Sequence, residues 1–356
     1  MFGEFSYISE AANEVLKRSE VHGNDILIAI TGDIGKVGII PDTVEKANIN
    51  QHIARVRIRK EALSYFVYQY LASDDTQKEY QKIKTGLSMP QLSLEQVRDI
   101  VVKIPEFNEQ GKIVDCLRRI DTLITLHQRK YEKLVNIKKS MLNKMFPPNG
   151  ASVPEIRFKG FTDPWEQRKL GDISEIKTGP FGSTLHADDY VSDGIPIITT
   201  EHFKTGSLPI DKCGLPQVSE NDFSRLSAYI LNAGDIVFSR VGSVDINTLI
   251  TPFQSTWLFS GRVLRVRPQN KNSSQFLHTL LETEDVKNDI RTRAVGQTMP
   301  SINTEILKTT PLRLPESTLE QEQLGKYFLN LDTLITLHQR EHIKPILEVK
   351  RVKRNE

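Results

Sequence analysis

The chain has very few cysteines: only Cys116 and Cys213 occur among its 356 residues. Neither lies in a C-x-x-C spacing or in a cluster with histidines, so a disulfide framework and a thiolate zinc site are both excluded. Long apolar runs are also missing, because no stretch approaches the roughly 18 to 20 residues of a membrane helix. The first five residues, Met-Phe-Gly-Glu-Phe, lack the basic start of a signal peptide. We therefore expect a cytoplasmic protein.

An excess of charge of either sign is missing as well. The chain has 47 Lys and Arg against 45 Asp and Glu, a net charge of +2. A stand-alone DNA-binding protein is usually visibly basic. If this chain binds DNA, its basic residues must be concentrated locally, or partner proteins must supply much of the phosphate contact. With 38% hydrophobic and 26% charged residues, the composition is that of a globular protein long enough for two domains.

The motifs of common enzyme sites are absent or incomplete. The segment around Gly35 and Lys36 resembles a phosphate-binding loop, but the pattern requires glycine where Ile30 stands and Ser or Thr where Val37 stands. Residues 179–182, Gly-Pro-Phe-Gly, lack the third glycine of a dinucleotide site. Residues 175–177, Glu-Ile-Lys, match a fragment of a two-metal nuclease site. A match of three residues in a chain of 356 is at the level of chance. No Asn/Asp-Pro-Pro-Tyr/Phe motif of an amino-methyltransferase is present, so the sequence predicts no catalytic site.

A long internal repeat dominates the sequence. Residues 121–129, Asp-Thr-Leu-Ile-Thr-Leu-His-Gln-Arg, recur letter for letter at 332–340. Farther upstream the correspondence continues with an offset of 210. Residues 86–90 correspond to 296–300, residues 55–57 to 265–267, and residues 25–27 to 235–237. The chain is therefore a tandem duplication of one large unit, not a solenoid of short repeats.

Each copy ends in a stretch with helical periodicity. In the first copy, positions 113, 117, 120, 124, 127, 131, 134, 138, 141 and 145 step alternately by four and three, and all are apolar or aromatic except His127 and Lys138. The second copy continues the pattern with Leu324, Phe328 and Leu331, after a capping box predicted at Thr318 to Gln321. So narrow a stripe needs a partner, and we predict an antiparallel coiled coil of the two helices. Two ordinary core helices are the alternative.

The segments before these helices predict a mixed fold. Short runs rich in β-branched residues, at 25–30, 52–58, 235–240 and 262–267, are typical of strands, and helical stretches follow at 61–80 and 274–291. The sequence therefore predicts an α+β fold with the following domains. These are an incomplete first domain (1–107), a helix (108–147), a linker (148–164), a second domain (165–317), a second helix (318–344) and a basic tail (345–356).

The duplicated arrangement resembles the specificity (S) subunit of type I restriction–modification systems. The residues that carry the resemblance are 165–173, Trp-Glu-Gln-Arg-Lys-Leu-Gly-Asp-Ile, followed by Thr-Gly-Pro-Phe-Gly-Ser at 178–183 and Gly-Ile-Pro at 194–196. These look like the opening of a target recognition domain. Leu314-Pro315 with Glu320-Gln321, and then 331–335, look like its exit into a spacer helix. Residues 104–121 repeat that exit.

The resemblance implies a non-catalytic DNA-binding subunit with two target recognition domains, each reading one half of a bipartite sequence in double-stranded DNA. The two spacer helices would hold the domains apart and dock two methyltransferase (M) subunits, which use S-adenosylmethionine to methylate adenine. Restriction/motor (R) subunits that depend on ATP and Mg²⁺ would join them. No cofactor is expected on this chain itself. A coiled-coil adaptor that binds protein in place of DNA is the alternative from another class.

Sequence-reading residues should lie on polar loops beside the predicted strands, where side chains supply donors and acceptors to bases and cations to phosphates. In the second domain we expect Lys177, Ser183, Thr184, Arg240, Ser243, Arg262, Arg293 and Gln297. In the first domain we expect Lys36, Asn50, Gln51, Lys84 and Ser88. A basic run on the first helix, Arg129, Lys130, Lys133, Lys138, Lys139 and Lys144, could face DNA or a methyltransferase, or be a solvated helix face.

The chain departs from the family pattern in two places. The counterpart of the opening at Trp165 would precede Met1, so the first domain lacks a strand and should have an exposed sheet edge. It could be a truncated or recombined copy that docks a methyltransferase but reads only one half-site. In addition, Pro345 removes a backbone donor from the second helix. We predict that this helix stops or kinks near residues 341–344.

Overall fold

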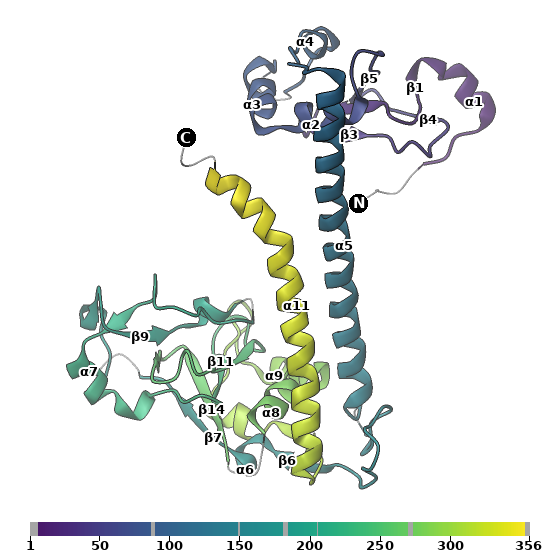
Figure 1. Ribbon diagram of the computed structural model, residues 1–356. Coiled ribbons are helices and arrows are strands. Elements are labelled where there is room, and N and C mark those ends of the chain that lie inside the picture. Colours follow the sequence, from purple (N-terminus) through teal and green to yellow (C-terminus); the bar gives the residue numbers. More distant parts are fainter. Residues whose placement is uncertain are drawn as a thin grey trace. The chain divides into compact units, whose positions relative to one another are not determined.

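The computed structural model describes residues 6–86, 90–148, 150–180, 184–204, 206–269 and 273–352, and the backbone only of residues 340–352. The chain divides into two compact units, residues 1–126 and 127–356. Each unit contains a small, mainly antiparallel sheet with helices packed on it (Figure 1). The predicted α+β fold class is therefore confirmed.

In the first unit, a three-stranded antiparallel sheet with the order β3-β2-β5 holds the core. Ile26 and Ile28 of its central strand are fully buried in one cluster with Phe66, Val67 and Leu71 of a helix. The elements of this unit are α1 (Glu10–Val15), η1 (Lys17–Ser19), β1 (Glu20–Val21), β2 (Ile26–Ala29), β3 (Val37–Ile39), β4 (Ala47–Asn48), β5 (Ile53–Val56), α2 (Ser64–Ala72), α3 (Asp74–Ile83), α4 (Leu94–Arg98) and the beginning of α5 (Phe107–Met145).

The second unit is built around the four-stranded sheet β12-β11-β14-β7. Its first part contains β6 (Glu166–Lys169), α6 (Leu170–Ile173), β7 (Ser174–Thr178), η2 (Ala187–Asp189), β8 (Tyr190–Val191), β9 (Ile195–Ile198), η3 (Thr200–Phe203), β10 (Gln217–Val218), α7 (Glu220–Arg225) and η4 (Ser227–Tyr229). Its second part contains β11 (Ile236–Ser239), β12 (Asn247–Leu249), β13 (Leu258–Phe259), β14 (Val263–Pro268), α8 (Ser274–Leu281), α9 (Glu284–Arg293), α10 (Thr304–Lys308), β15 (Pro311–Leu314) and α11 (Thr318–Val352).

The two sheets show the sequence repeat in three dimensions. Ile26 pairs with Val56 in the first sheet, and their counterparts Ile236 and Val266 pair in the second. The predicted helical stretches 61–80 and 274–291 each form two helices, divided at Ser73 and Thr283 respectively. Ser73 caps the second helix of its pair, since its hydroxyl accepts the N–H of Thr76.

The predicted heptad stripe is visible on α5. Within the second unit, positions 127, 131, 134, 138, 141 and 145 are all less exposed than most residues beside them. His127 contacts His338 of α11, and Lys138 contacts Asp332 of the same helix. Residue numbers thus rise along α5 while those of the partners fall along α11, as in an antiparallel pair. A coiled coil along the whole stripe stays a prediction.

The second long helix, α11, begins at the predicted residue 318 but differs from the prediction in its cap and at its C-terminal end. Its N-cap is Ser317, whose hydroxyl accepts the N–H of Glu320, so the capping box predicted at Thr318 is wrong by one residue. The helix continues to Val352, past the predicted end at 344. Pro345 removes one backbone donor, and a helix held by hydrogen bonds on both sides of that position tolerates the loss.

Candidate nucleic-acid interface

In the second unit, two loops meet at one end of the sheet. One is the turn between β11 and β12, and the other lies between α9 and α10. Val241 and Val295 both form a β-bridge with Ser301, and the N–H of Gly242 donates to the carbonyl of Pro300 at 2.8 Å. Residues 239–246 and 294–302 are called the second loop cluster below, because their main chains hold one another.

Glycine is required at the tip of each loop in this cluster. Gly242 and Gly296 have φ angles of +84° and +102°, in the left-handed region that side chains disfavour. A Cβ atom on Gly296 would also lie 2.9 Å from the carbonyl oxygen of Met299. The shape of the loop therefore depends on this residue.

Four of the predicted DNA-contacting residues come together here: Arg240, Ser243, Arg262 and Gln297. The backbone N–H of Arg240 donates to the carbonyl of Arg262 at 3.0 Å, which places the two arginines at adjoining strand ends. Ser243, Arg262 and Gln297 are exposed. A hydroxyl, a guanidinium and an amide on neighbouring loops are the groups with which proteins read base edges in the major groove.

The first unit repeats this construction. Thr31 and Thr85 both form a β-bridge with Gln91, so residues 29–36, 84–86 and 90–92 make a first loop cluster. Lys36 and Lys84, both predicted, are exposed and line one shallow depression of about 440 Å³. Two cations at one surface suit a phosphate group.

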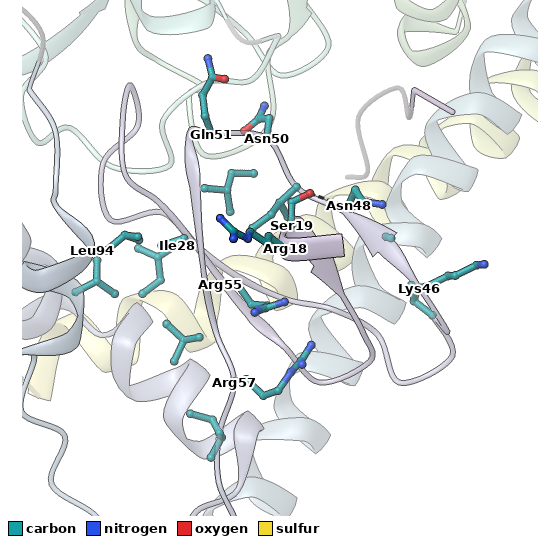
Figure 2. A pocket seen from close by; sticks show the side chains of 18 of the residues that line it. Arg18, Ser19, Ile28, Lys46, Asn48, Asn50, Gln51, Arg55, Arg57 and Leu94 are labelled. Carbon is teal, nitrogen blue, oxygen red and sulfur yellow. Dashed lines mark hydrogen bonds between the residues drawn. The ribbon is translucent and has the colours of Figure 1, made fainter. Parts of the chain in front are cut away.

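The remaining predicted residues of the first unit that the structure describes, Asn50 and Gln51, are exposed in the turn before β5 (Figure 2). Next to them lies His52, which the sequence reasoning missed. Its carbonyl accepts the N–H of Ile30 at 2.9 Å, and its Nδ1 lies 2.7 Å from the hydroxyl oxygen of Thr31. The repeat offset was the available signal, because it makes His52 the counterpart of Arg262.

The two loop clusters thus present different side chains on equivalent backbones. Ile30 and His52 stand where the second unit has Arg240 and Arg262. Both pairs are held by the same strand-to-strand hydrogen bond, from position 30 to 52 and from 240 to 262. Their chemistry differs, since two long cations are replaced by an apolar side chain and an imidazole.

Three predicted residues lie away from these clusters. Lys177 is part of β7, where its ammonium donates to the carbonyl of Ala228 and lies 4.8 Å from the ring centroid of Tyr229. The guanidinium of Arg293 is half-buried and donates to several groups of its own domain, including Thr310. Thr184 accepts a hydrogen bond from Arg225 through its carbonyl. Ser88 and Ser183 lie outside the described residues.

The second loop cluster also exposes two apolar side chains that the sequence reasoning missed. Val295 is 67% and Met299 69% exposed, on either side of Gln297. Exposed apolar groups beside polar ones can contact a thymine methyl group or enter a base step. The signal in the sequence was an apolar pair inside an otherwise polar glycine-containing turn.

An ion pair joins the paired strands β2 and β5 at the end away from the first loop cluster. An equivalent ion pair joins β11 and β14 in the second unit. The guanidinium of Arg57 donates to both carboxylate oxygens of Asp25, at 2.7 and 2.6 Å, and Arg267 does the same to Asp235, at 2.7 Å for both. Burial alone would raise the pKa of Asp25, but the hydrogen bonds from Arg57 and from the N–H of His22 lower it overall. Each pair therefore stabilises the sheet from which the loop clusters extend.

Across the described part of the chain, no three His, Cys, Asp or Glu side chains come together as a metal site. Over the same residues, no helix has both the length and the apolar character needed to cross a bilayer. The candidate interface is thus made of loops that carry polar, cationic and a few apolar groups.

A family model for the type I restriction modification DNA specificity domain matches residues 8–136 and 162–347. The chain belongs to this family. The two matches cover most of the chain and correspond to the two copies of the repeat. The resemblance drawn from the sequence is confirmed, and so is its non-catalytic class, since a specificity protein is the DNA-recognition component of a type I restriction system.

Two relatives of this specificity chain illustrate the likeness. The specificity subunit of the type I restriction enzyme MjaVIII from Methanocaldococcus jannaschii is 24% identical over 336 residues, which cover 90% of this chain and 75% of that protein. The EcoBI specificity subunit from Escherichia coli is 30% identical over 139 residues, which cover 39% of this chain and 28% of that protein.

Solved structures support the fold. The S subunit from M. genitalium matches with a TM-score of 0.60 at 16% identity, over 93% of this chain and 82% of its own. A chain from a type I R-M system whose complex assembly has been described matches with a TM-score of 0.53 at 18% identity, over 94% and 80%. The duplicated recognition domains with long helices are therefore an arrangement that solved S subunits share.

Proposed function

We propose that this specificity chain reads a bipartite target in double-stranded DNA, one half with each loop cluster. The observation that carries the proposal is the pair of equivalent clusters with different side chains. The exposed Arg262 suits a guanine edge or a phosphate, whereas the exposed His52 at the equivalent position suits other groups on the bases. One scaffold with two different sets of reading groups would recognise two different half-sequences, and hence an asymmetric site.

The catalytic work in this proposal belongs to other subunits. Two methyltransferase subunits, carrying S-adenosylmethionine, would dock on the helices, and restriction/motor subunits using ATP and Mg²⁺ would join them in the cytoplasm. The exposed basic face of α5 supports docking or phosphate contact: Arg129, Lys130, Lys133 and Lys139. Lys138 does not belong to that face, because its ammonium lies 2.8 Å from Glu282 and 2.7 Å from Asp332.

The test is to map adenine methylation in cells that express this chain with a cognate methyltransferase subunit. A split motif with two defined halves is expected. Arg262→Ala should relax or abolish the half read by the second domain and leave the other half unchanged. His52→Ala should do the reverse.

Arg168→Ala is the matched control, since Arg168 lies exposed on β6 and pairs with Glu166. It should leave both halves intact. A motif with a single defined half would contradict reading by the first domain. An unchanged motif in the Arg262 and His52 variants would contradict the assignment of the reading loops.

A further inference from the structure

Two histidines of the second unit face one another between α5 and α11. His127 lies on α5 and His338 on α11, and their Nδ1 atoms are 3.4 Å apart. The ring centroids are 5.6 Å apart, and the ring planes are tilted by 38° against one another. The rings therefore do not stack, and they approach one another through their Nδ1 atoms.

A hydrogen bond alone describes this contact poorly. N–H donors and their acceptors in proteins lie mostly about 2.7–3.2 Å apart, and the two nitrogens exceed that range. Such a bond also needs two different tautomers, because one ring must carry its proton on Nδ1 and the other must leave its Nδ1 unprotonated. Yet the two histidines occupy the same position of identical nonapeptides, so the repeat itself gives the two rings no reason to differ.

A metal ion held by both rings accounts for the separation and treats the two rings alike. Zn²⁺ binds histidine nitrogens at about 2.0–2.1 Å, and its ligands are arranged as a tetrahedron. Two nitrogens at that bond length and at the tetrahedral angle of about 109° lie about 3.3–3.4 Å apart. The Nδ1 atoms of His127 and His338 are at this separation. The fold therefore presents two ligands at the spacing that one ion requires.

The donor atoms and their surroundings favour a transition metal over a hard cation. His338 is 6% exposed and His127 is half-buried, so water reaches the pair mainly at His127. The next positions of the stripe carry no carboxylate, since they are Tyr131 on α5 and Leu331 and Ile335 on α11. Imidazole is a ligand for Zn²⁺, Cu²⁺ and Ni²⁺, whereas Mg²⁺ and Ca²⁺ prefer oxygen ligands. Within the part of the chain that the structure describes, no third His, Cys, Asp or Glu completes a metal site, so water would take the other positions.

We propose that His127 and His338 bind one divalent transition-metal ion of the Zn²⁺ type through their Nδ1 atoms, with water completing its coordination. The ion would join α5 to α11 at this point and so fix the register of the two helices. Its role is structural, and no reaction is assigned to the site. The proposal rests on the histidine pair and does not depend on the reading of DNA.

Binding of the ion should be coupled to the pairing of the helices. The two ligands are 211 positions apart in the chain, so only the folded protein holds their Nδ1 atoms close together. An ion that binds the folded form better than the unfolded chain stabilises the folded form increasingly as its concentration rises. Zn²⁺ should therefore raise the melting temperature of the second unit and protect backbone amides in both helices.

The experiment uses the full chain without an affinity tag, dialysed against EDTA and then against buffer without chelator. Calorimetric titration with Zn²⁺ should show one saturable site per chain, and Mg²⁺ should not bind there. Hydrogen exchange with and without Zn²⁺ should show added amide protection both in α5 near residue 127 and in α11 near residue 338. The exchange measurement needs no substitution, so it tests the site whether or not a variant folds.

Two substitutions test the ligands one at a time. His127→Gln and His338→Gln keep a polar amide at each position but remove the imidazole, and each should weaken Zn²⁺ binding by at least about tenfold. Both should also abolish the rise in melting temperature that Zn²⁺ gives the unaltered chain. His186→Gln is the matched control, because His186 is an exposed histidine of the same unit. Its affinity for Zn²⁺ should stay within about twofold of that of the unaltered chain.

Three results would refute the proposal: no saturable binding of Zn²⁺, equal affinity of the His127 variant and the control, or added protection confined to one helix. In the second and third cases, other ligands would hold the ion without joining α5 to α11. Failure of the zinc site with an intact methylation motif would leave the proposed function standing, so the two failures are distinguishable.

Discussion

His127 and His338, the same residue of the two identical nonapeptides, lie with their Nδ1 atoms 3.4 Å apart. A residue that contacts its own repeat counterpart lies on a local two-fold axis between two antiparallel helices. Lys138 and Asp332, on the same two helices, are 2.7 Å apart and extend the pairing in one direction. The repeat thus sets the register of the helices within the second unit.

The spacer should act as a ruler between the two recognition domains. The 39 residues of α5 have a length of about 58 Å at roughly 1.5 Å per residue. Removing residues 122–128 together with their counterparts 333–339 deletes one heptad from both helices and keeps the stripe continuous. The gap between the half-sites in the methylation motif should shorten by about three base pairs, since seven residues span about 10.5 Å and a base pair about 3.4 Å.

The control for this deletion removes four residues, 122–125, and their counterparts 333–336. It shortens the helices but puts the apolar stripe out of phase, so methylation should be lost and not shifted. A normal motif with an unchanged gap in the heptad variant would show that the helices do not measure distance.

The paired ammonium of Lys138 should stabilise the second unit. Glu282 and Asp332 both contact it, and Lys138→Met would leave two carboxylates close together without their cation. With 18% of the lysine side chain exposed, we expect a loss of about 2–3 kcal/mol in the free energy of unfolding. Urea unfolding followed by tryptophan fluorescence measures it, because both tryptophans, Trp165 and Trp257, belong to this unit.

Lys139→Met is the matched control, at an exposed neighbour on the same helix. It should change stability by less than about 0.5 kcal/mol. Adding Asp332→Asn to the Lys138 variant should recover part of the loss, since one unpaired carboxylate is removed. Equal stability of the Lys138 and Lys139 variants would show that the cluster contributes nothing.

The half-buried His278 should make the second unit sensitive to acid. Burial lowers the pKa of His278, and its Nδ1 lies 2.9 Å from Oδ1 of Asn247. The charged groups around it are Glu282, Lys138, Asp332 and Lys287. In the unfolded chain a histidine titrates near about pH 6.5, so the unfolded state binds more protons as the pH falls. The contribution of uncharged His278 to the free energy of unfolding is therefore fully present above about pH 6.5. It is lost as the pH falls below that value.

Urea unfolding at pH 7.5 and 5.5, again by tryptophan fluorescence, should show this loss at about 1 kcal/mol per pH unit in the acid range. His278→Gln should flatten the dependence, because glutamine cannot take up the proton. His186→Gln, at an exposed histidine of the same unit, should leave the slope unchanged. Parallel slopes in all three proteins would contradict the assignment.

The sequence predicted the architecture because the repeat is so exact. The offset of 210 makes Asp235 the counterpart of Asp25 and Arg267 the counterpart of Arg57, and the structure shows the same ion pair in both copies. The same offset makes Ile26 and Val56 the counterparts of Ile236 and Val266, and the two residues of each pair lie opposite one another in their sheet. A repeated pattern acts as an alignment of the chain with itself, so it shows which residues of the two copies are equivalent.

Features that depend on three-dimensional contact were not predictable in this way. Arg293 and Lys177 look like free cations in the sequence, but their donors are used inside the domain. His52 was overlooked because an isolated histidine gives no signal until its backbone is seen to bond Ile30. Of the stop or kink predicted near residues 341–344, the stop was wrong, because proline propensity is a local preference that the surrounding helix can outweigh.

The tip of the second loop cluster should be needed for DNA reading but not for folding. Gly296 has a φ of +102°, and a methyl group there would lie 2.9 Å from the carbonyl of Met299, so Gly296→Ala must displace the turn that carries Gln297. We expect the second half of the methylation motif to be lost, with about 1–2 kcal/mol lower stability of the second unit. Gly38→Ala is the control, because no atom lies within 4 Å of its Cβ position, and it should leave both half-sites unchanged. Retention of the complete motif by the Gly296 variant would show that sequence is read elsewhere on the domain.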